Sequence, residues 1–325
     1  MNFILTHKDI FLRTLRIIAV SLILTAAVCA VALYSRTISD FVYYNRTPIL
    51  AIAVLVLFIA LLAQYKQTAI LRENERLYQE LQVRQAHIER DLAMARNVQE
   101  GLLRQKIPQL RGCKITADCR PAQKIGGDFY GATEQKGLVH FFLGDVAGHG
   151  ISSALVMALT RGLLQELAQQ FNSPARILEA LNNRLNAYLQ NTLSFVTLFY
   201  ACYDPAGKKL TYASAGQHPA LFFRERKLFA KLQTGGAILG MFAGNKYPAK
   251  TVKLKSGDKL LCYTDGFLEA RAADGRELGE DFFSGQAQAI IHLPLEKIKT
   301  GIYAFTDKNA RTINDDLSLL CFEAG

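Results

Sequence analysis

The chain has 325 residues, of which 50% are hydrophobic and 20% charged, and its formal net charge is +10 at pH 7. This length gives room for about two domains, and the hydrophobic content suggests a soluble part joined to a membrane part. The basic residues are spread without an aromatic–basic platform, which argues against a nucleic-acid partner. The six cysteines form no C-x-x-C pair, a usage typical of a reducing cytoplasm that indicates neither a disulfide framework nor a zinc site.

Two stretches without a charged side chain, residues 17–35 and 47–65, lie near the start of the chain. A helix of either length spans about 28 Å, enough to cross a bilayer core. Only residues 36–46 join them as a loop, so residues 1–65 are predicted to form a transmembrane helical hairpin. Flanking basic residues favour a multi-pass protein of a bacterial-type inner membrane, with both termini and the soluble part cytoplasmic. A cleaved signal peptide is the alternative for the first span, and buried soluble helices for both.

Residues 66–107 have a helical pattern, with charges of both signs and no internal Pro before Pro108. As one helix this segment would be roughly 60 Å long. A heptad seam predicts a parallel coiled-coil linker and thereby a homodimer. The alternative is one amphipathic helix packed on the domain that follows. The seam consists of Asn74, Tyr78, Leu81, Gln85, Ile88, Leu92, Ala95, Gln99 and Leu102.

Residues 108–325 change to short alternating segments bounded by turns. Hairpin-joined strands with helices grouped between them predict an α+β fold. The predicted strands are 114–119, 138–143, 195–203, 209–214, 219–223, 251–254, 259–264 and 317–322, and the predicted helices are 151–170, 174–190 and 294–308. Ser173 and Pro174 fit the N-cap and first helical positions. Ser152 and Ser153 are predicted to cap the helix at 151–170.

Aspartates in four places stand in turns or at predicted strand ends: Asp128, Asp145, Asp265 and the pair Asp315–Asp316. Carboxylates that share one edge repel each other unless cations neutralise them. Two divalent cations would balance four carboxylates, and oxygen ligands favour the hard ions Mg²⁺ or Mn²⁺. Neighbouring glycines let the backbone approach an ion closely, so the carbonyl of Val146 is a further candidate ligand.

Seven motifs in order resemble the SpoIIE/RsbU branch of the PPM metal-dependent serine/threonine protein phosphatases. The resemblance covers about residues 93–324 and rests on "PAQKIGGDFYG", "GDVAGHGISSALVMA", "SFVTLFYACYDP", "YASAGQHPALFF", "GGAILGMF", "LLCYTDGFLEARAADGRELGEDFF" and "DDLSLL". It implies an α-β-β-α sandwich, with two antiparallel sheets flanked by helices, as a phosphatase domain at 108–325. Two departures are Gly131, where the family often has an acid, and Gln217, where a His is common; that second position is interpreted as structural.

The resemblance also implies two Mn²⁺ or Mg²⁺ ions between the sheets. By motif, Asp128, Asp145 with the Val146 carbonyl, and Asp265 hold them, and one acid of the last pair completes the set. Asp315 is favoured over Asp316. A water that bridges the ions attacks phosphorus in such sites, so no protein nucleophile is needed. Asp128 and Asp145 thereby serve catalysis as well as metal binding.

His149 is a candidate general acid for the leaving group, and the alternative is an ordinary turn residue before the helix at 151–170. The predicted function is a membrane-anchored phosphatase acting on phosphoserine or phosphothreonine. Its implied substrate is a phosphorylated regulatory protein, an anti-sigma-factor antagonist of STAS type. The alternative is a non-catalytic membrane-tethered scaffold that binds the same partner. A nucleotide cyclase is disfavoured, because Phe129 replaces the second acid of a GGDEF-like motif.

Overall fold

The computed structural model describes residues 36–103, 107, 111–190 and 192–325, with Ala19, Ile23, Ala26, Ala27 and Ala30 before them. By its contacts the chain divides into two units, Met1–Ala86 and His87–Gly325, and each is described by itself. The first predicted span, 17–35, lies outside the described residues apart from those isolated positions.

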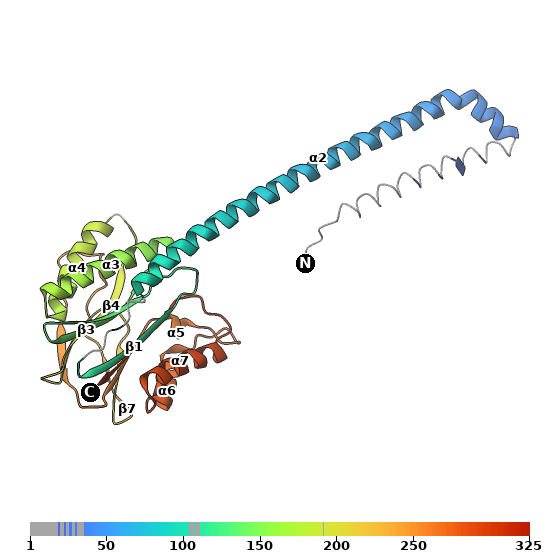
Figure 1. Cartoon of the computed structure of the whole chain (residues 1–325). Helices are drawn as coiled ribbons and strands as arrows, with labels where there is room; N and C mark the ends of the chain where they lie inside the picture. The colour runs from blue at the N-terminus through green and yellow to red at the C-terminus, as the bar shows by residue number, and fades with distance from the viewer. Residues whose placement is uncertain are drawn as a thin grey trace. The chain divides into compact units, whose positions relative to one another are not determined.

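Helix α2 (Arg36–Leu103) contains the second apolar stretch and nearly all of the predicted linker (Figure 1). Its portion Leu50–Leu103 includes an 18-residue window of mean hydropathy 1.9, and within the described residues it is the one helix long and apolar enough to cross a membrane. The prediction of a loop at 36–46 was wrong: those residues are helical. They contain neither Gly nor Pro to interrupt the helix.

The second unit contains two antiparallel sheets of five strands each, with strand orders β1-β10-β9-β6-β7 and β2-β3-β4-β5-β8. The first sheet comprises β1 (Cys113–Arg120), β10 (Leu317–Ala324), β9 (Lys259–Tyr263), β6 (Ala220–Arg224) and β7 (Lys227–Leu232). The second comprises β2 (Phe129–Gln135), β3 (Leu138–Val146), β4 (Val196–Asp204), β5 (Lys209–Ala215) and β8 (Ala249–Lys253).

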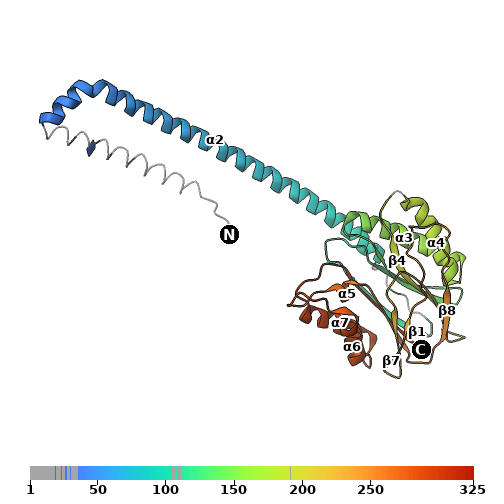
Figure 2. The ribbon, with the colours of Figure 1, turned by 180° about the vertical axis from the view of Figure 1, so that it is seen from behind.

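Helices cover the outer face of each sheet, which confirms the predicted α+β sandwich (Figures 1 and 2). Helices α3 (Ile151–Gln170) and α4 (Pro174–Leu189) share a core with the β2–β5 sheet. Helices α6 (Gly279–Ile290) and α7 (Leu295–Asn309) share one with the β9–β10 sheet. The short helix α5 (Gly266–Glu269) follows β9.

The period-two alternation of each strand creates these layers. On β4, Leu198 and Tyr200 face the α3–α4 core, whereas Phe199 and Ala201 face the core between the sheets. Strands that are buried on both faces therefore read as nearly continuous apolar runs. Of the ten strands in the described residues, eight were predicted from the sequence.

The three helices predicted within the second unit, 151–170, 174–190 and 294–308, were confirmed to within one residue, whereas β2, β7, α5 and α6 were not predicted. Ser173 and Pro174 occupy the predicted positions, although the Ser173 side chain makes no capping hydrogen bond. The capping role predicted for Ser152 and Ser153 was wrong. Gly150, with a φ of 83°, precedes the helix, and the buried Ser153 hydroxyl donates instead to the Gly150 carbonyl at 3.0 Å.

Two glycines let the turns at one end of the sandwich pack directly on Asp316. A Cβ at Gly126 would lie 1.9 Å from Asp316 Oδ2, and a Cβ at Gly266 would lie 2.1 Å from the Asp316 carbonyl oxygen. Both distances are far below van der Waals contact, so neither position admits a side chain. The segments before β2, after β9 and before β10 are thereby fixed against one another.

We expect Gly266→Ala to lower the free energy of unfolding by about 2 kcal/mol or more, because the new methyl group meets backbone rather than a movable side chain. Gly285→Ala is the matched control, since Gly285 lies in α6 and a Cβ added there would have nothing within 4 Å. That substitution should be neutral or stabilise by up to about 1 kcal/mol. Urea unfolding of the full-length chain measures both, and equal changes for the two variants would contradict the packing argument.

Candidate metal centre

All five candidate aspartates lie at the same end of the two sheets. Asp128 precedes β2 and Asp145 lies near the end of β3, where Phe129 pairs with Gly144. Asp265 follows β9, and Asp315 and Asp316 precede β10, the strand that pairs with β9. Antiparallel pairing thus brings the start of one strand beside the end of its neighbour, and the predicted convergence of the acids rests on this geometry.

Burial and mutual repulsion raise the pKa of three of these carboxyl groups. Burial, then the charges of Asp145 and Asp316, raises the pKa of Asp128 well above its usual range. Burial, then the charges of Asp265 and Asp315, raises the pKa of Asp145 to about 7. The pKa of Asp315 is raised by burial and, more weakly, by Asp265 and Asp316. The five groups therefore form one electrostatic cluster.

Asp315 and Asp316 have different surroundings although they are adjacent. The buried Asp316 carboxylate accepts the backbone N–H of Ala122 at 2.8 Å through Oδ1, and those of Gly127 at 2.8 Å and Asp128 at 3.3 Å through Oδ2. Asp315 is only partly buried, and its Oδ1 accepts the N–H of Asp316 at 2.7 Å. Both oxygens of Asp316 therefore accept hydrogen bonds from the backbone at and before the "GGD" turn, whereas Asp315 keeps one oxygen available to a metal ion.

The donor set fits a hard divalent cation. Asp265 Oδ1 is buried without a hydrogen-bond partner, an arrangement that costs free energy unless a proton or a cation is supplied. The carbonyl oxygen of Val146 also faces this region, since a Cβ on Gly127 would lie 2.7 Å from it. Carboxylate and carbonyl oxygens are the ligands that Mg²⁺ and Mn²⁺ prefer.

The described residues include no group of three or more His, Cys, Asp or Glu side chains already spaced as metal ligands. Some of the carboxylate oxygens instead take part in hydrogen bonds within the cluster. Thr264 Oγ1 donates to Asp128 Oδ2 at 2.8 Å, and Asp128 and Asp145 share a hydrogen bond that lowers the pKa of Asp145. Side-chain rotations that exchange these bonds for an ion are therefore part of any metal binding here.

His149 lies at the mouth of the cluster. Its side chain is exposed, its Nδ1 is 3.2 Å from Gln123 Nε2, and its charge lowers the pKa of Asp315. Gln217 is buried and donates to the Tyr263 carbonyl at 3.0 Å, a structural role that agrees with the interpretation from the sequence. At Gly131 a Cβ would lie 2.4 Å from the Phe142 ring, so no acid fits there.

Sequence reasoning missed three residues that contact or influence the cluster. Thr264 holds Asp128, and Glu269 lies close enough to Asp265 and Asp315 for their charges to raise its pKa, after burial. Gln99 is 7% exposed at the end of α2. Its Nε2 donates to the Gly126 carbonyl at 2.6 Å, and its Oε1 accepts the Gly126 N–H at 3.3 Å. The sequence had indicated Gln99 only as a member of the heptad seam, not as a residue that contacts Gly126.

We expect the ion-free protein to lose stability as pH rises from about 4 to about 7. The folded state raises the pKa of Asp145 from 3.8 to about 7, so it binds more protons than the unfolded state across that window. Asp145→Asn should therefore raise the melting temperature of the EDTA-treated full-length protein at pH 8. Mn²⁺ should raise the melting temperature of the wild type by more than that of the variant.

Differential scanning fluorimetry measures these shifts, and Asp274→Asn is the control because Asp274 is exposed and pairs with Arg276. An ion-free Asp145→Asn protein that melts below the wild type at pH 8 would contradict the repulsion described here.

Comparison with known proteins agrees with this geometry. A family model described as Stage II sporulation protein E (SpoIIE) matches residues 135–325. The chain is 29% identical over 222 residues to the phosphoserine phosphatase RsbU of Bacillus subtilis (strain 168), an alignment that covers 66% of each chain. The chain spans 33% to 66% of the length of three curated relatives that it matches.

Solved structures share the sandwich. The SiaA-PP2C domain of Pseudomonas aeruginosa superposes with a TM-score of 0.67 at 23% identity, covering 74% of this chain and 98% of that one. The RsbU and RsbW domains of Rv1364c from Mycobacterium tuberculosis give a TM-score of 0.59 at 26% identity, covering 67% and 61% of the two chains. With its family model matching more than half of the sequence, the chain belongs to the SpoIIE family.

Proposed function

We propose that this chain is a metal-dependent phosphatase that removes phosphate from phosphoserine or phosphothreonine of a regulatory protein. The observation that supports this most is the convergence of the aspartates, which raise one another's pKa around the unpartnered Oδ1 of Asp265. Such a cluster gains stability from cations and has no evident use without them. RsbU, similar over two thirds of this chain, is named a phosphoserine phosphatase.

Asp128, Asp145, the Val146 carbonyl, Asp265 and Asp315 are the proposed ligands of two Mn²⁺ or Mg²⁺ ions. Asp316 instead fixes the "GGD" turn through three backbone N–H groups. When bound, two such ions supply a water of lowered pKa for attack on phosphorus and offset charge on the phosphoryl oxygens. Thr264 orients Asp128, so the protein's own contribution is to bring these oxygen ligands together at one end of the two sheets.

His149 is the proposed proton donor to the leaving serine or threonine oxygen. Its imidazole is exposed at the mouth of the cluster and close enough to Asp315 to lower the pKa of that carboxyl. A donor at this place meets a phosphorylated side chain that enters from solvent. Gln123, 3.2 Å from Nδ1, would leave Nε2 for the substrate.

A folded protein is the proposed substrate class, specifically an anti-sigma-factor antagonist of STAS type. The resemblance to the SpoIIE/RsbU branch suggests this class, and the partly exposed position of Asp145, Asp265 and Asp315 is compatible with a phosphorylated residue on a protein surface. The alternative, a non-catalytic scaffold for the same partner, leaves the buried acid cluster unexplained.

The activity test uses full-length protein in detergent with Mn²⁺ and a phosphoserine STAS-domain protein. We expect Asp145→Asn to lower kcat/KM by about a hundredfold or more, because the substitution removes a proposed metal ligand and its negative charge. His149→Ala should lose about a hundredfold in kcat if it is the proton donor. Asp274→Asn, at an exposed acid that pairs with Arg276, should keep wild-type turnover. Absence of turnover with Mn²⁺ on every phosphoprotein tried would favour the scaffold.

The chain is proposed to consist of a transmembrane helical hairpin at 1–65, a coiled-coil linker at 66–107 and the phosphatase domain at 108–325, anchored as a multi-pass protein of a bacterial inner membrane with the domain in the cytoplasm. The apolar window of Leu50–Leu103 supports an anchor. Tyr78, Leu81 and Ile88 are 69%, 60% and 60% exposed, and these seam side chains would be covered by a second copy in a parallel homodimer.

Leu81→Asp tests the dimer, because a carboxylate at a seam position removes the apolar contact with the second helix and places an unpaired charge in the interface. We expect it to raise the dimer dissociation constant by about tenfold or more. Val83→Asp is the matched control on the same helix, since Val83 is 70% exposed and lies off the seam. Sizing with light scattering of the full-length protein measures both variants. A monomeric wild type, or equal dimer dissociation constants for the two variants, would contradict the coiled coil.

A further inference from the structure

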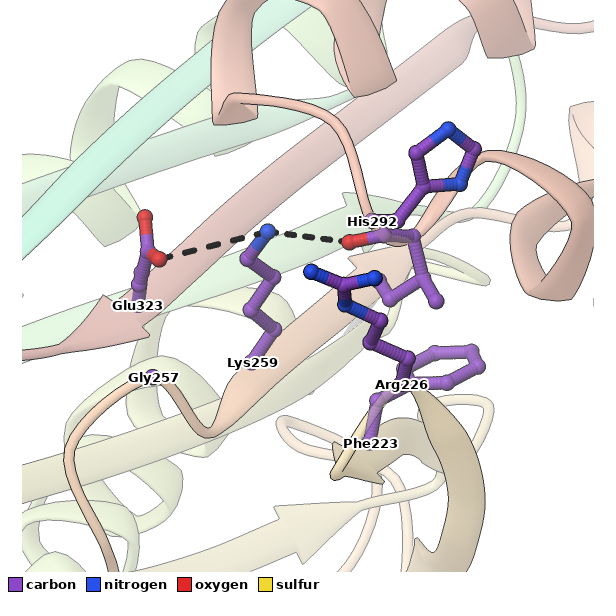
Figure 3. A pocket seen from close by; sticks show the side chains of 7 residues that line it. Phe223, Arg226, Gly257, Lys259, His292 and Glu323 are labelled. Atoms are coloured by element: carbon purple, nitrogen blue, oxygen red, sulfur yellow. Dashed lines mark hydrogen bonds and ion pairs between the residues drawn. The ribbon is translucent and has the colours of Figure 1, made fainter.

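A polar cavity lies at the opposite end of strands β9 and β10 from the acid cluster. It has a volume of about 240 Å³ and is lined by Phe223, Arg226, Gly257, Lys259, Ile291, His292 and Glu323 (Figure 3). Lys259 begins β9 and Glu323 lies near the end of β10, whereas Asp265 and Asp316 lie at the other ends of the same strands. At about 3.3 Å per residue, the two sites are about 20 Å apart.

Lys259 places a buried positive charge in this cavity. The residue is 8% exposed, and its Nζ donates to the carbonyls of Ile291 at 2.9 Å and Leu293 at 2.8 Å. An ammonium group has three N–H donors, and the nearest carboxylate oxygen, on Glu323, is 3.9 Å away. That separation is beyond hydrogen-bond distance, so one donor remains for another acceptor.

Arg226 adds a second positive charge at the mouth. Glu225 and Arg226 form the turn between β6 and β7 with φ values of 50° and 63°, a conformation that favours Gly or Asn. Gln288 holds this turn on α6, donating to the Arg226 carbonyl at 2.6 Å and accepting the Leu228 N–H at 2.8 Å. Among the described contacts the Arg226 guanidinium has no hydrogen bond or ion pair, and Figure 3 shows Lys259 between Glu323 and Arg226.

The cavity therefore combines two cations with one carboxylate over a buried floor of Phe223 and Ile291, which are 1% and 2% exposed. Its volume equals roughly eight waters at about 30 Å³ each and lies below the usual range for drug-sized ligands. A guanidinium fork beside an ammonium is suited to the planar or tetrahedral oxygens of a carboxylate or a phosphate group. We propose that this cavity binds a small oxyanion, at a site separate from the acid cluster.

The proposal is tested by isothermal titration calorimetry on full-length protein in detergent with EDTA present. With EDTA present the acid cluster offers carboxyl groups and no cation that could hold an anion, so binding there does not confuse the result. Inorganic phosphate and succinate are the two probes, and they distinguish a phosphate ligand from a carboxylate ligand. Binding of either probe by the wild type, with the variant effects below, supports the site and identifies its chemical class.

Two variants are expected to act in opposite directions. Arg226→Ala should weaken binding about tenfold or more, because a charge-assisted hydrogen bond is lost. Glu323→Gln should tighten binding about two- to fivefold, because the negative charge nearest to the ligand is removed. Arg276→Ala, at an exposed arginine paired with Asp274, should bind like the wild type.

Three results would overturn the oxyanion site. One is no heat of binding by the wild type up to about 10 mM of either probe, well above a Kd of 1 mM. Another is unchanged affinity in both Arg226→Ala and Glu323→Gln. The third is a loss of affinity in Arg276→Ala as large as that in Arg226→Ala, which would indicate non-specific attraction to basic surface.

Discussion

Electrostatic repulsion among aspartates is the constraint on which the functional end of this domain depends. Five carboxyl groups meet where two antiparallel sheets end, and the pKa of Asp128, Asp145 and Asp315 is raised by burial and by neighbouring charge. A fold keeps such an arrangement only when something compensates it. In the proposed phosphatase, two hard cations compensate the repulsion. They also offset the free-energy cost of Asp265 Oδ1, which is buried without a hydrogen-bond partner.

Rigid packing holds these charges together in the absence of ions. Gly126 and Gly266 allow two turns to touch Asp316, and Asp316 in turn binds three backbone N–H groups of the segment 122–128. One acid of the adjacent pair thus serves as a structural clamp while the other stays available. The same strands, β9 and β10, continue to the cavity around Lys259, so a single pair of strands connects two sites of opposite charge.

Much of this organisation could be predicted from the sequence, because apolar alternation marks buried strands and aspartates beside glycines mark their ends. Strand β2 was missed since Gly131 and a polar end, Glu134 and Gln135, interrupt its alternation. Helix α6 was missed because it begins with Gly279 and contains Gly285, both poor helix formers. The roles of Thr264 and Gln99 depend on hydrogen bonds to residues 136 and 27 positions away, and no local pattern encodes such contacts.

Gln99 also limits how helix α2 can meet the domain. One side chain satisfies both polar groups of the Gly126 residue, and each step along an α-helix turns a side chain by about 100°. A slip of α2 by a single residue would point Gln99 away and leave a buried N–H and C=O unpaired beside the turn that carries Asp128. The rotation of α2 about its own axis at its last turn is therefore fixed relative to the backbone turn that carries Asp128.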